Sequence, residues 1–346
     1  MSKEPGAQSA SQWEAELGGD LLKSVSRTFY LSLKLLPGGT RAPIALGYLL
    51  ARASDTVADT LSGQRATKTE ILTNFDLAIE GCAEARRISA EFAKEHAGGL
   101  SHPGEATLLA RFDHCLSWLD TFDEPRQELV RSTLRTIIEG QRIDMKTFLS
   151  DTAVTAIATP GDLEHYTYCV AGSVGEFWTH VCSSELGLEC FDDQPRKMLP
   201  AGIALGKGLQ LINILRDFPV DWSRGRCYLP KNQIIHAGGS LEADPINCDS
   251  FKKVSRQWEG VCERYLDQGL TYVTRITSRR LRLATSLPLL FAIKTLRTLQ
   301  SSIWEQRWSG VKISRSDTRR ISARASVVSL SRVRLASFYK ELGRNG

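Results

Sequence analysis

The cysteines of this chain lack the spacing of a metal site or of a disulfide framework. Eight cysteines are scattered over 346 residues, with no CxxC and no tight cysteine–histidine pattern. The sequence therefore signals neither a zinc site nor a set of structural disulfides, and it favours reduced thiols in a cytosolic protein.

Apolar segments typical of a signal peptide or of a membrane anchor are also missing. Residues 1–20 contain no apolar core that could direct secretion. The most apolar late stretch, Leu281–Leu299, is a poor membrane span because charged residues and a proline interrupt it. The interrupting residues are Arg282, Pro288, Lys294 and Arg297. We expect a cytoplasmic protein that is soluble or attached peripherally to a membrane.

The charge balance has no large excess of either sign. The 44 basic and 39 acidic residues give a net charge of +5. Such a small excess argues against a nucleic-acid partner, although local arginine clusters favour acidic substrates or an anionic membrane surface.

Alternating strand patterns, internal repeats and low-complexity blocks are absent as well. Apolar residues instead recur at helical spacings through most of the chain, which predicts a nearly all-α protein. Residues 1–15 are rich in small and polar types and predict a loose tail. By length alone the remainder, 16–346, could form two domains or one helical domain with a large core.

The most informative stretch is 210–230, QLINILRDFPVDWSRGRCYLP. Asn213, Asp217 and Asp221 are spaced four apart, so their side chains share one face of a helix. Carboxylate and amide oxygens suit Mg²⁺, which proteins hold through one or two carboxylates together with substrate phosphates. Pro219 lies between the aspartates, and we expect the helix to end or kink there.

A second acidic pair with the same spacing occurs upstream. Tyr48, Arg52, Asp55 and Asp59 form one polar stripe on an otherwise apolar helical pattern. A solvated surface face would explain such a stripe. Apolar residues on all sides argue instead for burial, and buried carboxylates need partners or a metal.

Two acidic pairs across one helical cavity would hold several Mg²⁺ ions and stabilise a diphosphate leaving group. The carbocation left behind needs a dry pocket with aromatic walls. The candidate wall residues are Phe29, Tyr48, Tyr168 and Phe177. Small residues around Ala171–Gly175 let either another helix or a long apolar ligand approach closely.

At this point the sequence resembles the squalene and phytoene synthases, which join two prenyl diphosphates head to head. The resemblance covers about residues 19–299. It rests on four motifs in the family's order, which are SRTF, YLLARASDTVADT, YCVAGSVGEFWT and QLINILRDFPVDWSRGRCYLP. It implies one all-α isoprenoid-synthase domain, with helices around a central active-site cavity.

The resemblance implies Mg²⁺-binding pairs at Asp55 with Asp59 and at Asp217 with Asp221. It also implies residues that bind the substrate diphosphates or support the second pair, which are Arg27, Arg52, Arg216, Arg226, Asn213 and Gln210. Tyr48 and Tyr168 match tyrosines near the reacting carbons. The residues implied for the prenyl pocket are Phe29, Ala171, Gly172, Val174 and Gly175.

The product depends on whether a nicotinamide cofactor binds. Lys312 and Arg315 lie in a basic segment that resembles the one near the NADPH phosphates of squalene synthases. A solvated basic tail is the alternative. No glycine-rich dinucleotide motif follows a strand, so an NADPH site here would be of a non-Rossmann kind.

We expect a squalene-synthase-like enzyme that uses Mg²⁺, NADPH and two farnesyl diphosphates, with a peripheral membrane contact for product release. A phytoene, dehydrosqualene or presqualene diphosphate synthase without the reduction is the first alternative. A non-catalytic helical assembly or lipid-binding factor is the second, and the presence of all four aspartates argues against it.

Overall fold

The computed structural model describes residues 9–26, 29–60, 65–149 and 153–344, except for the side chains of 59–60 and 65–67. The chain divides into two compact units, residues 1–141 and 142–346. The single domain expected for 16–346 stays a prediction, and each unit is considered by itself.

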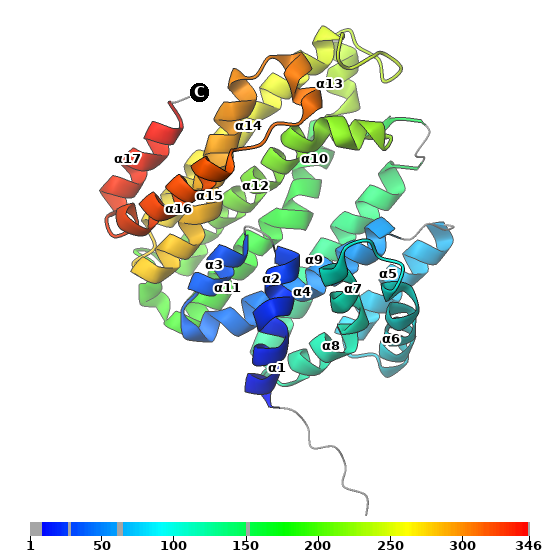
Figure 1. Cartoon of the computed structure of the whole chain (residues 1–346), viewed down its shortest axis with the longest axis vertical. Helices are drawn as coiled ribbons and strands as arrows, with labels where there is room; N and C mark the ends of the chain where they lie inside the picture. Colours follow the sequence, from blue (N-terminus) through cyan, green and yellow to red (C-terminus); the bar gives the residue numbers. More distant parts are fainter. Residues whose placement is uncertain (1–8, 27–28, 61–64, 150–152, 345–346) are drawn as a thin grey trace, which may run out of the picture. The chain divides into compact units, whose positions relative to one another are not determined.

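The first unit is helical in its described residues (Figure 1). Its elements are α1 (Ala10–Glu16), the π-helical η1 (Leu17–Leu21), α2 (Leu22–Ser26), α3 (Phe29–Leu35), α4 (Gly38–Thr60), α5 (Arg65–Ile79), α6 (Ala83–Ala97), α7 (Pro103–Ala110), α8 (Phe112–Asp120) and most of α9 (Glu124–Thr147). Fully buried side chains of α4, such as Leu49 and Leu50, contribute to its core. Stacked rings of Phe75 and Phe112, 4.1 Å apart, bring α5 against α8.

The loose tail predicted for residues 1–15 is wrong over residues 10–15, which belong to α1. Ser9 and Gln12 form a capping box that satisfies backbone donors at the start of this helix. Trp13 is buried, and its ring lies 5.1 Å from that of His114 on α8. Burial of one large ring thus holds a short helix that its polar composition did not reveal.

The second unit is also almost entirely helical in its described part. Its elements are β1 (Thr155–Ala156), α10 (Pro160–Thr167), the π-helical η2 (Tyr168–Gly172), α11 (Ser173–Leu186), the 3₁₀ segment η3 (Leu188–Cys190), α12 (Pro195–Ser223), β2 (Arg226–Cys227), α13 (Lys231–His236), α14 (Asp249–Thr274), α15 (Arg279–Ser301), the 3₁₀ segment η4 (Trp304–Ser309), α16 (Arg315–Val328) and α17 (Arg332–Leu342). The two short strands pair in parallel, with Thr155 opposite Arg226. The all-α prediction is confirmed.

Helix α12 is the central helix of the candidate site in this unit. Its glycines let it cross η2 and α11 at backbone contact. A Cβ atom added to Gly206 would lie 2.1 Å from the Ala171 carbonyl oxygen, and one added to Gly175 of α11 would lie 2.0 Å from the Gly202 carbonyl oxygen. No larger residue fits this crossing without moving a helix.

Of the two outcomes expected at Pro219, an end of the helix is wrong, because α12 continues to Ser223. A kink there stays a prediction. Pro219 removes only the bond that its N–H would make to the Leu215 carbonyl. Phe218, the residue that proline restricts, is buried and packs among four aromatic rings at centroid distances of 5.6–6.1 Å. Tertiary packing therefore outweighs the local preference. The chain turns at Gly225, whose φ is 74°.

Among the described helices, α12 alone has the length and apolar composition of a membrane span, and more than half of its apolar stretch is buried within the protein. That degree of burial is typical of a core helix. Helix α15, which contains the stretch expected to be a poor span, does not meet the same criterion.

Candidate functional site

The first acidic motif lies on α4, where an arginine joins two carboxylates. Arg52 donates from Nη1 to Oδ2 of Asp55 at 2.6 Å, and from Nη2 to Oε1 of Glu105 on α7. Burial lowers the pKa of Arg52, but the charges of Asp55 and Glu105 outweigh this and raise it. Arg52 is therefore a fixed positive charge beside a carboxylate that is 42% exposed.

Glu105 was not among the predicted site residues. It follows His102 and Pro103 at the start of α7, where its backbone N–H donates to Nδ1 of His102 at 3.3 Å. Only the fold brings this carboxylate to Arg52. The side chain of Asp59, the partner of Asp55, lies outside the described residues.

Tyr48 connects the α4 motif to the end of α2. Its hydroxyl donates to the Val25 carbonyl at 3.0 Å, and its ring lies 5.6 Å from that of Phe29. Two of the predicted wall residues are thus brought together. Arg27, a predicted diphosphate ligand, lies outside the described residues.

The second acidic motif lies near the end of α12. Arg216 donates from Nε to Oδ1 of Asp217 at 2.8 Å and from Nη2 to Oδ2 at 2.5 Å. The hydrogen bond to Asp217 and the nearby charge of Asp221 raise the pKa of Arg216, although burial lowers it. Asp217 is 43% exposed, so its oxygens remain accessible to a ligand.

The other predicted residues of this motif are close to it in the chain. Asn213 is exposed and Gln210 is half-buried, both on α12 before Asp217. Arg226 is half-buried in β2, just after the turn at Gly225. The binding roles of these three residues stay predictions.

Tyr168 begins the π-helical turn of η2. Its hydroxyl donates to Oε2 of Glu176 on α11 at 3.0 Å. Burial and then the Glu176 carboxylate raise the pKa of Tyr168, so the phenol stays protonated. Glu176 lies within a motif quoted above, but its side-chain partner could not be predicted from the chain.

A second tyrosine cluster, missed by the sequence analysis, centres on Asp144 of α9. Its Oδ2 accepts from Tyr228 at 2.9 Å and from Tyr166 at 3.3 Å. The two rings stack at 5.2 Å. Burial, and then the charges of Asp144 and Asp221, raise the pKa of Tyr228 well above its ordinary value. Tyr228 follows Arg226 of β2 by two residues, so the cluster is close in the chain to the second acidic motif.

A third cluster surrounds Lys207 of α12. Its ammonium pairs with Oε2 of Glu164, which also accepts from the Tyr265 hydroxyl. The ammonium lies 4.7 Å from the centre of the Tyr265 ring. Burial lowers the pKa of Lys207, but the hydrogen bonds to Glu164 and Tyr265 outweigh this and raise it. Lys207 is thus held as a cation one helical turn before Gln210.

Two of the glycines predicted for the prenyl pocket lie against helix α12. A Cβ atom on Gly172 would lie 3.2 Å from side-chain carbons of Ile203 and Lys207, and Gly175 faces the backbone of Gly202. Helix α12 fills the space that both missing side chains leave, which favours helix packing as the reason for these glycines. Their role in a prenyl pocket stays a prediction. For Phe29, Ala171 and Val174 the pocket role stays a prediction.

The predicted cofactor residues Lys312 and Arg315 are both exposed near the start of α16. The backbone N–H of Asp317 already bonds to the Ser314 hydroxyl at 2.9 Å. This cap places a carboxylate in the first turn, where a cofactor phosphate would otherwise gain from the helix dipole. NADPH binding stays a prediction.

The donor set of the two acidic motifs fits Mg²⁺. Among the described side chains, no three His, Cys, Asp or Glu residues form a ready-made metal cluster. Mg²⁺ needs no such cluster, because it keeps waters and takes substrate phosphate oxygens beside one or two carboxylates. Asp55 and Asp217 are exposed enough to serve as those carboxylates.

Comparison with curated proteins shows moderate similarity to several prenyl synthases. The chain is 29% identical over 255 residues to 15-cis-phytoene synthase of Synechococcus elongatus, covering 71% of this chain and 69% of that protein. It is 26% identical over 245 residues to presqualene diphosphate synthase of Zymomonas mobilis, covering 70% of this chain and 68% of that protein.

Larger relatives match over part of their length only. The chain is 28% identical over 223 residues to a bifunctional lycopene cyclase/phytoene synthase of Podospora anserina. The match covers 63% of this chain and 35% of that protein, so the chain spans about a third of its length.

Solved structures share the fold. A ligand complex of TcSQS aligns with a TM-score of 0.74 at 21% identity, covering 93% of this chain and 88% of that one. Squalene synthase HpnC from Alicyclobacillus acidocaldarius aligns with a TM-score of 0.58 at 17% identity, covering 84% of this chain and 95% of that one. The fold is therefore the all-α isoprenoid-synthase fold.

The model of the squalene/phytoene synthase family matches residues 22–317. This range contains both acidic motifs, the Tyr168–Glu176 pair and the clusters around Asp144 and Lys207. Members of this family are prenyltransferases. The chain belongs to the squalene/phytoene synthase family.

Proposed function

We propose that this protein condenses two farnesyl diphosphates head to head to presqualene diphosphate and then reduces that intermediate with NADPH to squalene. The observation that carries the proposal is the pairing of an arginine with a partly exposed aspartate in each acidic motif. A site for a metal diphosphate needs both charges side by side, carboxylates for the cation and guanidinium groups for the phosphate oxygens.

In this proposal Mg²⁺ supplies charge neutralisation of the diphosphate leaving group. Asp55 and Asp217 would hold the metal. Arg52 and Arg216 then bind phosphate oxygens, since a planar guanidinium can bridge two of them. Because the pKa of each arginine is raised, both guanidinium groups are charged at neutral pH.

The tyrosine clusters would control protons near the reacting carbons. Tyr168 and Tyr228 both have raised pKa values and therefore keep their hydroxyl protons at neutral pH. Tyr166 and Tyr228 share Asp144 as an acceptor, which orients both hydroxyls. A protonated phenol beside a leaving diphosphate can donate a hydrogen bond to it, and its ring face tolerates a nearby carbocation.

The reduction is supported only by the basic residues Lys312 and Arg315. An enzyme that stops at presqualene diphosphate, or that eliminates a proton as phytoene and dehydrosqualene synthases do, would share the rest of the site. The similarity to presqualene diphosphate synthase and to phytoene synthase favours keeping this alternative. A squalene-sized product also needs an apolar acceptor, which favours the membrane contact expected from the sequence.

A product assay tests the proposal. Purified protein with farnesyl diphosphate and Mg²⁺ should form squalene when NADPH is present and stop at presqualene diphosphate or by-products when it is absent. If NADPH leaves the products unchanged, the proposed reduction is wrong, whereas the proposed condensation is not contradicted. Preference for geranylgeranyl diphosphate in the same assay would support the phytoene alternative. No turnover of either substrate would support a non-catalytic role.

A further inference from the structure

The C-terminal hairpin, residues 312–344, comprises the segment before α16, helices α16 and α17 and the turn between them. It carries the net positive charge of the whole protein. Residues 310–346 contain nine of the 44 basic residues but two of the 39 acidic ones. The remaining 309 residues therefore have 35 basic against 37 acidic residues, and the +5 of the chain comes entirely from this segment.

Most of these charges face solvent without an ionic partner. Three arginines of the hairpin pair with carboxylates, namely Arg320 with Asp317, Arg324 with Glu341 and Arg332 with Asp192. The basic residues that are exposed and make no ion pair with a described residue are Lys312, Arg315, Arg319, Arg334, Lys340 and Arg344. Intramolecular pairing thus leaves a strongly basic surface.

The turn of the same hairpin exposes aliphatic side chains. Val327 and Leu330 are each 57% exposed and Val333 is 77% exposed. They come from the last turn of α16, the connection and the first turn of α17. Exposed aliphatic residues beside unpaired cations are typical of surfaces that insert shallowly into lipid headgroups.

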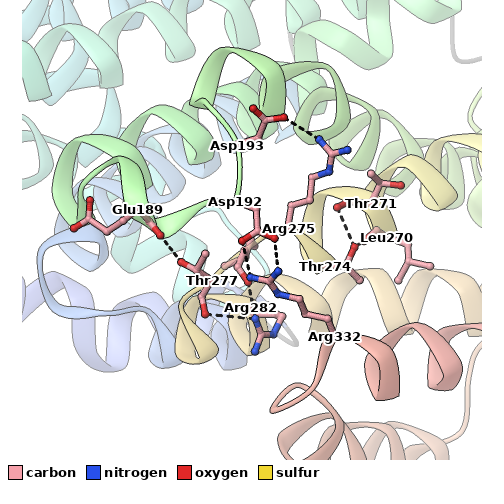
Figure 2. A network of polar contacts seen from close by, with 11 residues as sticks. Glu189, Asp192, Asp193, Leu270, Thr271, Thr274, Arg275, Thr277, Arg282 and Arg332 are labelled. Carbon is pink, nitrogen blue, oxygen red and sulfur yellow. Dashed lines mark hydrogen bonds and ion pairs between the residues drawn. The ribbon is translucent and has the colours of Figure 1, made fainter.

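The hairpin is held as a fixed structure, so these residues are displayed together. Figure 2 shows Arg332 at the start of α17 reaching Asp192, and Arg282 reaching the residues around Thr277. The buried Arg282 also donates from Nε to the Ser329 carbonyl at 2.8 Å, which fixes the end of α16. On α17 the Tyr339 hydroxyl donates to Oδ1 of Asp267 at 3.0 Å.

We propose that the C-terminal hairpin docks this protein on an anionic lipid bilayer. Each Lys or Arg near such a surface contributes about 1 kcal/mol, so a few unpaired ones suffice for reversible attachment. A nucleic acid fits the surface less well, because the two aromatic residues of the hairpin, Phe338 and Tyr339, are buried and offer no stacking platform. The family match ends at residue 317, so most of the hairpin lies beyond it.

Vesicle binding tests this proposal without any substrate, so its outcome is separate from that of the proposed function. The full chain should sediment with vesicles of equimolar phosphatidylcholine and phosphatidylglycerol at low salt, and much less with phosphatidylcholine alone. The variant Arg334→Gln/Lys340→Gln should bind the anionic vesicles about tenfold more weakly or worse. The matched variant Lys253→Gln/Arg256→Gln removes two exposed charges of α14 and should bind within about twofold of the parent.

The aliphatic residues are tested with a second matched pair. Leu330→Ser/Val333→Ser should weaken binding several-fold, whereas Ile235→Ser/Ile303→Ser, which removes exposed aliphatic residues elsewhere, should not. Circular dichroism identifies any variant that fails to fold, and single substitutions at the same positions then replace it. The proposal would be overturned if the hairpin and control variants lost vesicle binding equally, or if the parent protein did not bind anionic vesicles. Tighter binding to single-stranded DNA than to vesicles, lost with Arg334 and Lys340 but not with the serine pair, would also overturn it.

Discussion

Asp55 on α4 and Asp217 on α12 each lie beside an arginine of their own helix, but the two arginines are held differently. Arg52 lies between Asp55 and a second carboxylate, Glu105, which a different helix provides. All hydrogen bonds described for Arg216 go to its neighbour Asp217. To turn toward a phosphate, Arg216 would break hydrogen bonds to one residue only. Arg52 would break hydrogen bonds to two residues on different helices. We infer that Arg52 orients Asp55 in addition to binding diphosphate, and that Arg216 binds diphosphate alone.

Loss of either carboxylate should have the largest effect, because the proposed reaction uses both motifs. We expect Asp55→Ala and Asp217→Ala each to lower kcat/KM about a thousandfold or more, since each leaves an arginine and a metal without their carboxylate. Steady-state assays with farnesyl diphosphate measure this. Asp249→Ala, at a residue whose side chain is 95% exposed, is the control and should keep full activity. Substantial activity in only one of the two variants would show that the motifs do not share a reaction.

The helix crossing that supports the second motif can be tested by filling one glycine. Gly175→Ala should lower the free energy of unfolding by about 2 kcal/mol or more, because the new Cβ meets the Gly202 carbonyl oxygen. Gly260→Ala on α14 is the matched control. Its Cβ would have one neighbour within 4 Å, at 3.8 Å, so helix propensity should raise stability by about 0.5–1 kcal/mol. Urea titrations measure the change in the free energy of unfolding. A change of the same sign in both variants would contradict the close crossing.

Glu105 distinguishes the two arginines directly. Glu105→Gln keeps the shape of the side chain but removes the negative charge that lies beside Arg52. We therefore expect kcat to fall about tenfold with a small change in KM. Arg216→Lys should act mainly on KM for farnesyl diphosphate, because lysine cannot bridge two phosphate oxygens. Initial rates over a range of substrate concentrations separate the two effects. The reverse pattern would make Arg52 the main residue that binds diphosphate.

The buried tyrosine of the Asp144 cluster should make stability depend on alkaline pH. The pKa of Tyr228 is raised in the folded protein, so the unfolded chain loses this proton first as pH rises past about 10. Stability is then fully present below that pH and falls above it, by about 1.4 kcal/mol per pH unit for one tyrosine. Urea titrations between pH 8 and about 11 should show a shallower fall for Tyr228→Phe. Identical slopes in both proteins would contradict the burial of this hydroxyl.

The features that the sequence predicted well are local in the chain. Arg52 and Asp55 are one turn apart and share a helix face, and Arg216 and Asp217 are neighbours in the chain, so neither pair depends on another element. Their partners from other elements, such as Glu105 and Asp144, could not be assigned because no spacing rule joins them. The continuation of α12 past Pro219 and the filling of Gly172 and Gly175 also depend on tertiary packing, which overrides local preference.

The most direct test of the central claim is the amount of diphosphate released from farnesyl diphosphate in the presence of Mg²⁺ and the absence of NADPH. Condensation of two molecules to presqualene diphosphate frees one diphosphate for every two farnesyl groups consumed. We predict this ratio of one to two, together with its loss in Asp55→Ala and Asp217→Ala. One diphosphate released per farnesyl group, with no presqualene diphosphate detected at any time, would contradict head-to-head condensation by this protein.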